Sequence, residues 1–223
     1  KMMTSIGGEY CLTKSQFKAL LSSYAGYSDY DKSNPAVKAW VKIGKTQDGR
    51  DVINDLTLEE IKTVAEQPGA LRGLFSSESL LNIVCNVGNT NSWSRPQFEA
   101  IPVTSWHEIP PEAWQVVGAS DKGKRVIRDL LETNKLTEES FKNIMSSSDL
   151  VNIICDIGGV NGWSISQFKS NRMGNWKYIT KGWDTVGKSA AGRNLVTDLT
   201  VSEIEKLDKV TQVNMLKSTD LAK

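Results

Sequence analysis

The hydrophobic residues of this chain fall into short segments with helical spacing, separated by glycine, proline and small polar residues. In the segment SSDLVNIICDI (147–157), Leu150, Ile153 and Ile157 share one face of a predicted helix, which a serine caps and Gly158 ends. No segment alternates convincingly between apolar and polar residues in the manner of a strand. The pattern therefore predicts an all-α fold built from several short helices.

A sequence frame, W-x3-G-x4-G-x5-D-L, occurs three times with unchanged internal spacing. Each occurrence follows a related hexapeptide, LTKSQF, WSRPQF or WSISQF, which ends at Phe17, Phe98 or Phe168. Self-similarity of this kind indicates tandem repeats, here of about 70–80 residues. The positions of the frame are Trp40, Gly44, Gly49, Asp55 and Leu56, then Trp114, Gly118, Gly123, Asp129 and Leu130, then Trp183, Gly187, Gly192, Asp198 and Leu199.

Three helical repeats are predicted, at 1–81, 82–151 and 152–223, with a tyrosine-rich insertion at 22–35 in the first. The last seven residues, KSTDLAK, align with SSESLLN and SSSDLVN of the earlier repeats. The chain thus starts and stops at one repeat phase, and we expect it to be a fragment of a longer array. Its units would stack, or follow one another as compact beads.

Polar residues between the apolar segments predict where the helices begin and end. The tryptophan-bearing helix of each repeat is expected to end at Gly44, Gly118 or Gly187, where glycine can adopt the left-handed conformation. Hydroxyl side chains are expected to cap the following helices. The predicted N-caps are Thr13, Ser94 and Ser164 for the phenylalanine-bearing helix and Thr57, Thr137 and Thr200 for the last helix, where Glu60 and Glu203 complete capping boxes.

The stretch GWDTVGKS (182–189) matches the nucleotide-binding pattern G-x4-G-K-[ST]. A phosphate loop needs a strand before its glycine-rich turn and a helix after it, whereas here a tryptophan-bearing helix precedes the turn. The aligned stretches AWVKIGKT and AWQVVGAS lack one or two of the fixed residues. The repeat explains the match more simply, because Gly187 would end one helix and Ser189 would cap the next.

Residues with the chemistry of a catalytic or metal site are scarce. His107 is the only histidine, which excludes a site with several histidines. Cys11, Cys85 and Cys155 form no Cys-x-x-Cys pair, and we interpret them as thiols, the last two inside an apolar helix. We therefore predict no catalytic residue, no cofactor and no metal site.

The polar residues of the frame allow a chemical and a structural interpretation. Asp55, Asp129 and Asp198 could form a set of carboxylates, but their position before an apolar residue favours hydrogen bonding at helix ends. A basic residue also follows the second glycine of each frame and could bind an anion. A solvated surface, or pairing with the frame aspartates, is the favoured interpretation for these three residues, which are Arg50, Lys124 and Arg193.

Composition narrows the class of protein. The 223 residues include 27 basic and 26 acidic side chains, and 39% are hydrophobic, as in a folded chain. The net charge of +1 provides no broad cationic surface for nucleic acid. No apolar run approaches a membrane span, and the start KMMTSIGGEY lacks the apolar core of a signal peptide. We expect a soluble chain, and assign it no compartment.

All seven tryptophans fall on positions that recur between repeats. This recurrence favours packing in a core or between repeats, whereas an exposed aromatic row would instead stack on sugar rings or bases. Departures from the repeat are the candidate partner-binding residues, because the scaffold does not require them. These candidates are Tyr24, Tyr27 and Tyr30 of the insertion, in a composition typical of binding loops, and Arg172, Trp176 and Lys177 of the stretch NRMGNWKY.

Together these features predict a non-enzymatic structural or interaction module. Its partner would be another protein or its own parent assembly, for example a virion or tail structure. The alternative is an adhesin or carbohydrate-binding array that uses exposed tryptophans. A third hypothesis is an enzyme or a nucleotide-binding protein that uses residues 182–189.

Overall fold

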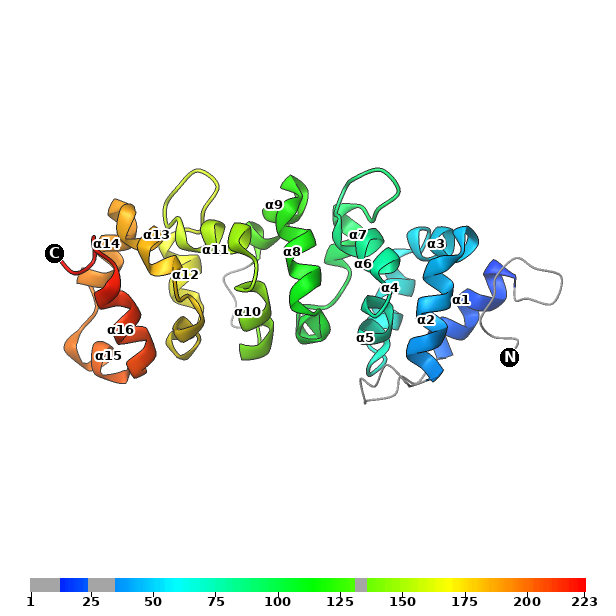
Figure 1. The fold of residues 1–223 in the computed structure, drawn as a ribbon, viewed down its shortest axis with the longest axis horizontal. Coiled ribbons are helices and arrows are strands. Elements are labelled where there is room, and N and C mark those ends of the chain that lie inside the picture. Colours follow the sequence, from blue (N-terminus) through cyan, green and yellow to red (C-terminus); the bar gives the residue numbers. More distant parts are fainter. Residues whose placement is uncertain (1–12, 24–34, 131–135) are drawn as a thin grey trace. The chain divides into compact units, whose positions relative to one another are not determined.

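The computed structural model describes residues 13–23, 35–130 and 136–223. Over these ranges the chain forms α-helices and short 3-10 helices and contains no strand (Figure 1). The all-α class predicted from the sequence is therefore confirmed. The chain divides into two compact units, Lys1–Gly123 and Lys124–Lys223, whereas the limits of the three repeats stay a prediction.

The helices are short, so their stability must come from packing against one another rather than from helix propensity alone. None of the helices in the described ranges combines the length and the apolar character that a membrane span needs. The helices of the first unit are α1 (Lys14–Ser23), α2 (Pro35–Lys45), α3 (Gln47–Asn54), α4 (Leu58–Ala65), α5 (Ala70–Phe75), α6 (Glu78–Cys85), α7 (Arg95–Glu99), η2 (Val103–Glu108) and α8 (Pro111–Ala119).

The division between the units falls within α9 (Asp121–Asp129). In the first unit, α2 packs against α3, α5 and α6; in the second, α13 packs against α11, α14 and α16. The helices of the second unit are α10 (Glu138–Ile144), α11 (Ser148–Cys155), α12 (Ile165–Ser170), η3 (Met173–Tyr178), α13 (Gly182–Lys188), α14 (Ala190–Thr197), α15 (Val201–Lys206) and α16 (Lys209–Lys217).

The helix starts follow the predicted caps closely. The Thr57 hydroxyl accepts a hydrogen bond from the Glu60 N–H at 3.3 Å, and the Glu60 carboxylate accepts one from the Thr57 N–H at 2.8 Å. Each such box satisfies two backbone donors that a helix start leaves unpaired. Further boxes join Thr13 to Gln16, Ser94 to Gln97, Ser164 to Gln167 and Thr200 to Glu203.

Thr137 was predicted to cap the same helix of the repeat as Thr57 and Thr200, but the helix that follows it has a different place in the fold. It is α10, and it leads directly into α11, whereas α4 is followed by α5 and α15 by α16. The N-cap Thr137 precedes Ser147 by the same number of residues as Asp208, the N-cap of α16, precedes Ser218. By this spacing α10 corresponds to α16, and by its place directly before the next helix it corresponds to α5, rather than to α4 and α15.

The tryptophan-bearing helices end one residue after the first glycine of the frame, at Lys45, Ala119 and Lys188, close to the predicted ends. None of these glycines adopts the left-handed conformation that the prediction assigned to them. A Cβ on Gly44 would collide with the Ser77 side chain, and one on Gly187 would stand 2.8 Å from the Ser218 hydroxyl. These two positions therefore need glycine because a neighbouring segment packs directly against the helix backbone. The described glycines with positive φ are Gly69, Gly88 and Gly158.

The second glycine of the frame has one structural reason in all three occurrences. A Cβ on Gly49 would collide with the carbonyl oxygen of Ile43, in the last turn of the preceding helix. Gly123 and Gly192 stand in the same way against the carbonyl oxygens of Val117 and Val186. Two helices can thus meet at a tight corner only if this residue lacks a side chain.

Each unit has an aromatic cluster in its core. In the first unit the ring centroids of Trp106 lie 5.6 Å from Phe98 and 5.2 Å from Trp114. In the second, Phe168 and Trp183 lie 5.3 Å and 5.7 Å from the ring of Trp176. All six rings are buried, and tilted or edge-on contacts of this kind are favourable between aromatic side chains. The clusters account for the recurrence of Phe and Trp in the sequence.

Candidate functional site

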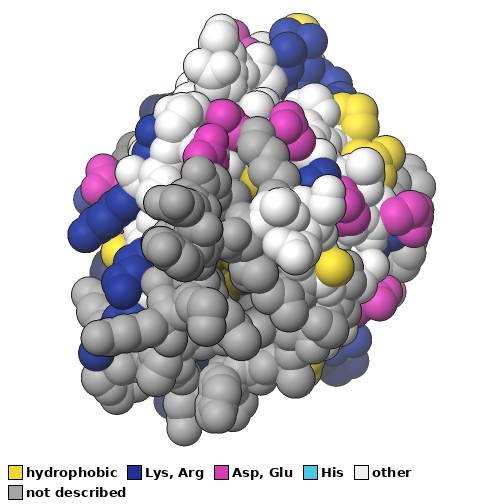
Figure 2. All heavy atoms as spheres, turned by 90° about the vertical axis from the view of Figure 1, so that its right-hand side faces the viewer, with side chains coloured by type: hydrophobic (Ala, Val, Ile, Leu, Met, Phe, Trp, Pro, Cys, Tyr) yellow, Lys and Arg dark blue, Asp and Glu magenta, His cyan; other side chains and the backbone are white. Residues whose placement is uncertain are grey.

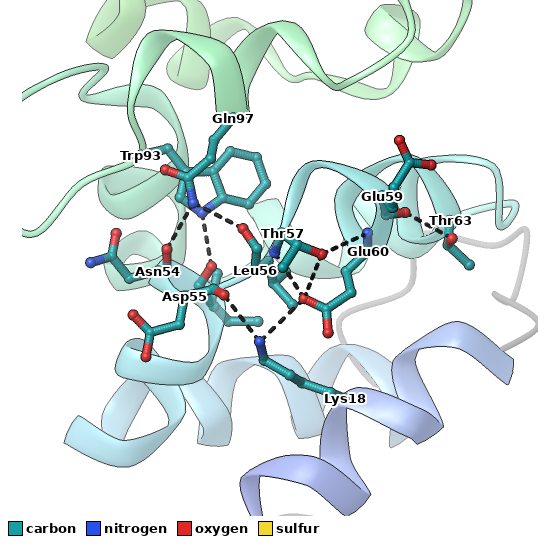
Figure 3. Close-up of polar contacts among 11 residues, drawn as sticks. Lys18, Asn54, Asp55, Leu56, Thr57, Glu59, Glu60, Thr63, Trp93 and Gln97 are labelled. Atoms are coloured by element: carbon teal, nitrogen blue, oxygen red, sulfur yellow. Dashed lines mark hydrogen bonds and ion pairs between the residues drawn. The ribbon is translucent and has the colours of Figure 1, made fainter.

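The most specific polar contacts of the first unit lie at the carboxyl end of α3 (Figure 3). The indole N–H of Trp93 donates to the carbonyl oxygen of Ile53 at 2.8 Å. The amide N–H of Gln97 donates to the carbonyl oxygens of Asn54 at 2.9 Å and Leu56 at 3.0 Å. The last carbonyl groups of a helix have no partner N–H within the helix, and here the side chains of Trp93 and Gln97 donate the missing hydrogen bonds.

The second unit contains the same arrangement at the carboxyl end of α9. Trp163 donates from its indole N–H to the carbonyl oxygen of Ile127 at 3.2 Å, and Gln167 donates to that of Arg128 at 2.8 Å. We call each pair, Trp93 with Gln97 and Trp163 with Gln167, a Trp–Gln clamp. Both tryptophans are buried in the core. From there each clamp binds the end of a helix that lies far away in the sequence.

Gln97 also explains why the hexapeptide contains glutamine rather than glutamate. Its side-chain oxygen accepts from the backbone N–H of Ser94 at 2.9 Å, while its amide nitrogen donates to the end of α3. A carboxylate could accept in the capping box but could not donate. The recurrent dipeptide QF is the sequence signal for this role, and its glutamine is a functional residue that the helical pattern alone does not reveal.

A charged pair lies beside the first clamp (Figure 3). The ammonium group of Lys18 donates to the carbonyl oxygen of Asp55 at 3.0 Å and stands 3.2 Å from the carboxylate of Glu60. Partial burial raises the pKa of Glu60, but the hydrogen bonds from Thr57 and Lys18 outweigh it, so the pKa lies below its ordinary value. The ionised form of Glu60 therefore stabilises this corner.

The frame aspartates lie at helix ends, as predicted. Asp55 and Asp198 are the C-caps of α3 and α14, and Asp129 is the last residue of α9. The sequence left open a solvated surface or pairing with these aspartates for Arg50 and Arg193. Arg193 is exposed and Arg50 is half-buried, and among the described residues neither is paired with a frame aspartate. Both guanidinium groups instead donate to the carbonyl oxygens of the first frame glycines, at 2.9 Å for Arg50 and 2.8 Å for Arg193.

These arginines therefore act as caps for the tryptophan-bearing helices. A cation near the carboxyl end of a helix also interacts favourably with the helix dipole. The sequence shows a basic residue directly after the second glycine of the frame. It does not show the partner, because that partner is a backbone oxygen.

The candidate partner-binding residues lie in different surroundings. Tyr24, Tyr27 and Tyr30 lie outside the described residues. Arg172 is exposed, whereas Trp176 is buried against its aromatic neighbours and cannot contact a partner from that position. Lys177 is half-buried, with its ammonium group 2.7 Å from the carboxylate of Glu138.

Glu138 is the centre of a small polar group on α10 and η3. The Tyr178 hydroxyl donates to it at 2.6 Å. Hydrogen bonds from Lys177 and Tyr178 lower the pKa of Glu138, and the bond to Glu138 raises the pKa of Lys177. Lys177 thus remains a cation and is held against α10.

Residues 182–189, which match the phosphate-loop pattern, are part of two helices. Gly182–Lys188 forms α13, and Ser189 caps α14 by accepting from the Gly192 N–H at 2.9 Å. A Cβ on Gly182 would stand 2.6 Å from the sulfur of Cys155, so this glycine serves helix packing. The first backbone N–H groups of α13, those of Gly182, Trp183 and Asp184, already donate to the carbonyl oxygens of the three residues before them, Ile179, Thr180 and Lys181.

The remaining reactive groups also have structural surroundings. Cys85 and Cys155 are buried, and burial raises the pKa of both thiols. His107 lies with its Nδ1 2.9 Å from the Thr104 carbonyl oxygen. Within residues 13–23, 35–130 and 136–223, no three His, Cys, Asp or Glu side chains gather as a metal site.

All seven tryptophans are buried, each with 4% or less of its surface exposed. On the face shown in Figure 2, acidic and basic side chains are interspersed and hydrophobic ones are scattered. Comparison with protein-family models, curated proteins and solved structures found no match to this chain.

Proposed function

We propose that this chain is a non-enzymatic structural and interaction module built from tandem helical repeats. The Trp–Gln clamp is the observation that carries the proposal. The clamp joins the same sequence positions in both units: Ile53 and Ile127, which receive the indole N–H groups, each precede a frame aspartate by two residues. A repeating bond between one segment and the helix end of an earlier one is how repeat proteins build a continuous core.

The polar side chains described above form structural hydrogen bonds, which supports a module that catalyses no reaction. The frame arginines cap helices, the hexapeptide glutamines join segments, and the two described thiols are buried. Active sites instead arrange such groups in a cleft with perturbed pKa values.

The proposed partner is another protein or the parent assembly, for example a virion or tail structure. Accessible groups that the packing does not require are the natural contact residues. Arg172 meets this condition in the second unit, and the tyrosine-rich insertion at 22–35 supplies the second candidate surface.

The burial of the tryptophans argues against the carbohydrate-binding alternative. Sugar recognition by stacking requires an exposed aromatic face. The helix over residues 182–188 argues in the same way against nucleotide binding, because it removes the loop that the motif requires.

The proposal is tested by affinity capture with the full chain as bait. We expect a protein partner to be retained by the natural chain and lost when Tyr24, Tyr27 and Tyr30 are all changed to Ser, or when Arg172 is changed to Ser. Val160→Ser, at a loop residue with 95% of its surface exposed, is the matched control. Binding of ATP by calorimetry, or of sugars on a glycan array, would contradict the proposal.

A further inference from the structure

The last two helices of the second unit leave an apolar face uncovered. Large hydrophobic side chains on α15 and α16 are exposed, among them Ile204 at 42%, Val213 at 47% and Leu216 at 72%. Isolated exposed hydrophobic residues are common, but a group on two neighbouring helices marks an interaction surface. We call Ile204, Val213 and Leu216 the α15–α16 face.

The corresponding positions elsewhere in the chain are buried. Leu216 precedes Ser218 by two residues, as Phe75 precedes Ser77 and Met145 precedes Ser147. Phe75 is 6% exposed and Met145 is 9% exposed. The sequence thus keeps a hydrophobic residue at this position, and in the two other cases the fold covers it.

Ile204 shows the same contrast. It follows the N-cap Thr200 by four residues, as Ile61 follows Thr57, and Ile61 is 1% exposed. Both helices begin with the same capping box, so the two isoleucines have equivalent places on their helices.

In two of the other cases, elements later in the chain pack against the helix concerned: α4, which carries Ile61, and α10, which Met145 follows directly. In the first unit α7 packs against α4, and the Ser105 hydroxyl of η2 donates to the carbonyl oxygen of Ala65 at 3.1 Å. In the second, η3 packs against α10, and Lys177 and Tyr178 bind Glu138. The covering segment in both units has the sequence W-S-x2-Q-F-x7-W, at 93–106 and 163–176.

The carboxyl end of α14 also has no clamp. By spacing from the frame aspartate, Val196 and Thr197 correspond to Ile53 and Asn54, which receive Trp93 and Gln97. Among the described residues, no side-chain N–H donates to the carbonyl oxygens of Val196 or Thr197. An apolar surface and unclamped helix-end carbonyls are therefore presented together.

We propose that the α15–α16 face and the end of α14 form a docking site for a polypeptide segment with the sequence W-S-x2-Q-F-x7-W, supplied from outside residues 1–223. This inference rests on the proposed function. The segment's phenylalanine and second tryptophan cover Leu216 and Ile204, while its first tryptophan and glutamine clamp the carbonyls of α14. The two segments of this type within the chain are already engaged, and the first hexapeptide has Leu12 in place of tryptophan.

Charge refines the sequence expected of the partner. Lys209 on α16 stands where Glu138 stands on α10, directly after the N-cap residue. Glu138 receives Lys177, the residue that follows the second tryptophan of its covering segment. The partner is therefore expected to have an acidic residue at that position, because a second cation beside Lys209 would be repelled.

The test extends the full chain after Lys223 with a second copy of its own residues 153–181, in which the residue corresponding to Lys177 is Glu. Tethering keeps the local concentration of the segment high. We expect amide hydrogen exchange of α16 to slow by at least about tenfold. The matched control has Ala at the positions of the extension that correspond to Trp163 and Gln167, and it should give no protection.

Two variants of the natural part of the chain complete the test. Leu216→Asp should abolish the protection, with Val213→Glu as a second variant on the same face; Val160→Asp should leave it intact. Both altered face residues are exposed, so the fold tolerates the change, which circular dichroism verifies. Protection that is absent, or that survives Leu216→Asp, overturns the proposal.

A second copy of the chain could occupy the α15–α16 face instead, and sedimentation velocity of the chain without the extension tests this. The proposal expects a monomer. A dimer that Leu216→Asp dissociates would assign the face to a second copy and overturn the occupant proposed here. None of these variants alters the tyrosine-rich insertion or Arg172, so failure here is distinguishable from failure of the capture experiment.

Discussion

Several single side chains in this protein hold two segments together. Gln97 accepts at one end from its own helix start and donates at the other to the end of α3, and Gln167 does the same at α9. A side chain that satisfies buried or partly buried polar groups at both ends leaves several unpaired when it is replaced. The stability of the fold should thus depend strongly on these residues.

Replacing Gln97 by Glu separates the two roles. The carboxylate keeps the capping box but cannot donate to Asn54 and Leu56, whose carbonyl oxygens would also repel it. We expect a loss of about 1–3 kcal/mol in the free energy of unfolding, measured in urea. Gln167→Glu should have a similar effect in the second unit, and an unchanged midpoint for both would refute the double role.

The aromatic clusters differ in two indole hydrogen bonds: Trp106 and Trp114 each donate to a carbonyl oxygen, whereas Trp176 and Trp183 have no partner among the described residues. Trp106 donates to the carbonyl oxygen of Ile101 at 2.9 Å, whereas the indole N–H of Trp176 has no hydrogen-bond partner among the described residues. Trp106→Phe should therefore cost about 1 kcal/mol more than Trp176→Phe, since both remove the same ring volume but only the first breaks a bond. Chemical denaturation of the two variants measures this difference, and equal losses would count against it.

At the scale of helices, glycines permit the corners and hydroxyl caps define the starts. Thr57, Ser94 and Ser164 could be identified from sequence because a cap involves residues three apart in the chain. The role of Gly44 could not, because its neighbour Ser77 is distant in the sequence and the same glycine spacing also fits a helix end. The short helices η2 and η3 were not predicted either, because a 3-10 helix of six residues is too short to show a periodic hydrophobic pattern.

Gly49→Ala tests the requirement for a tight corner. The new methyl group would meet the carbonyl oxygen of Ile43, so we expect a loss of about 1–3 kcal/mol in stability. Gly174→Ala is the matched control, since a Cβ there meets nothing within 4 Å. Thermal unfolding of the two variants should separate them clearly, and similar midpoints would mean that the corner relaxes without cost.

Glu60→Gln tests the electrostatic part of the α4 start. The pKa of Glu60 is lower in the folded chain than its ordinary value of 4.5, so its contribution is present above that pH and is lost as pH falls through the lower, folded value. Glutamine preserves the capping box, as Gln97 shows. We expect the natural chain to be the more stable at pH 7, and the difference to shrink as the pH falls below 4.5 and to vanish below the folded pKa of Glu60. A constant difference across this range would exclude the linkage.

At the scale of the whole molecule, the sequence predicted the all-α class and the helix caps because both depend on local patterns. It identified the recurrent tryptophans but not what they bind: the indole partners Ile53 and Ile127 are backbone oxygens distant in sequence. The same holds for Arg50 and Arg193. Contacts between a side chain and a remote backbone group become visible only when the chain is folded.

The central claim is that the tryptophans build the interior of a scaffold rather than a surface for ligands. Tryptophan fluorescence with acrylamide quenching tests it most directly, because all seven indoles report together. The burial of every tryptophan predicts blue-shifted emission that acrylamide barely quenches until the chain is unfolded. Red-shifted emission that is readily quenched in the folded chain would contradict the claim and favour the carbohydrate-binding alternative.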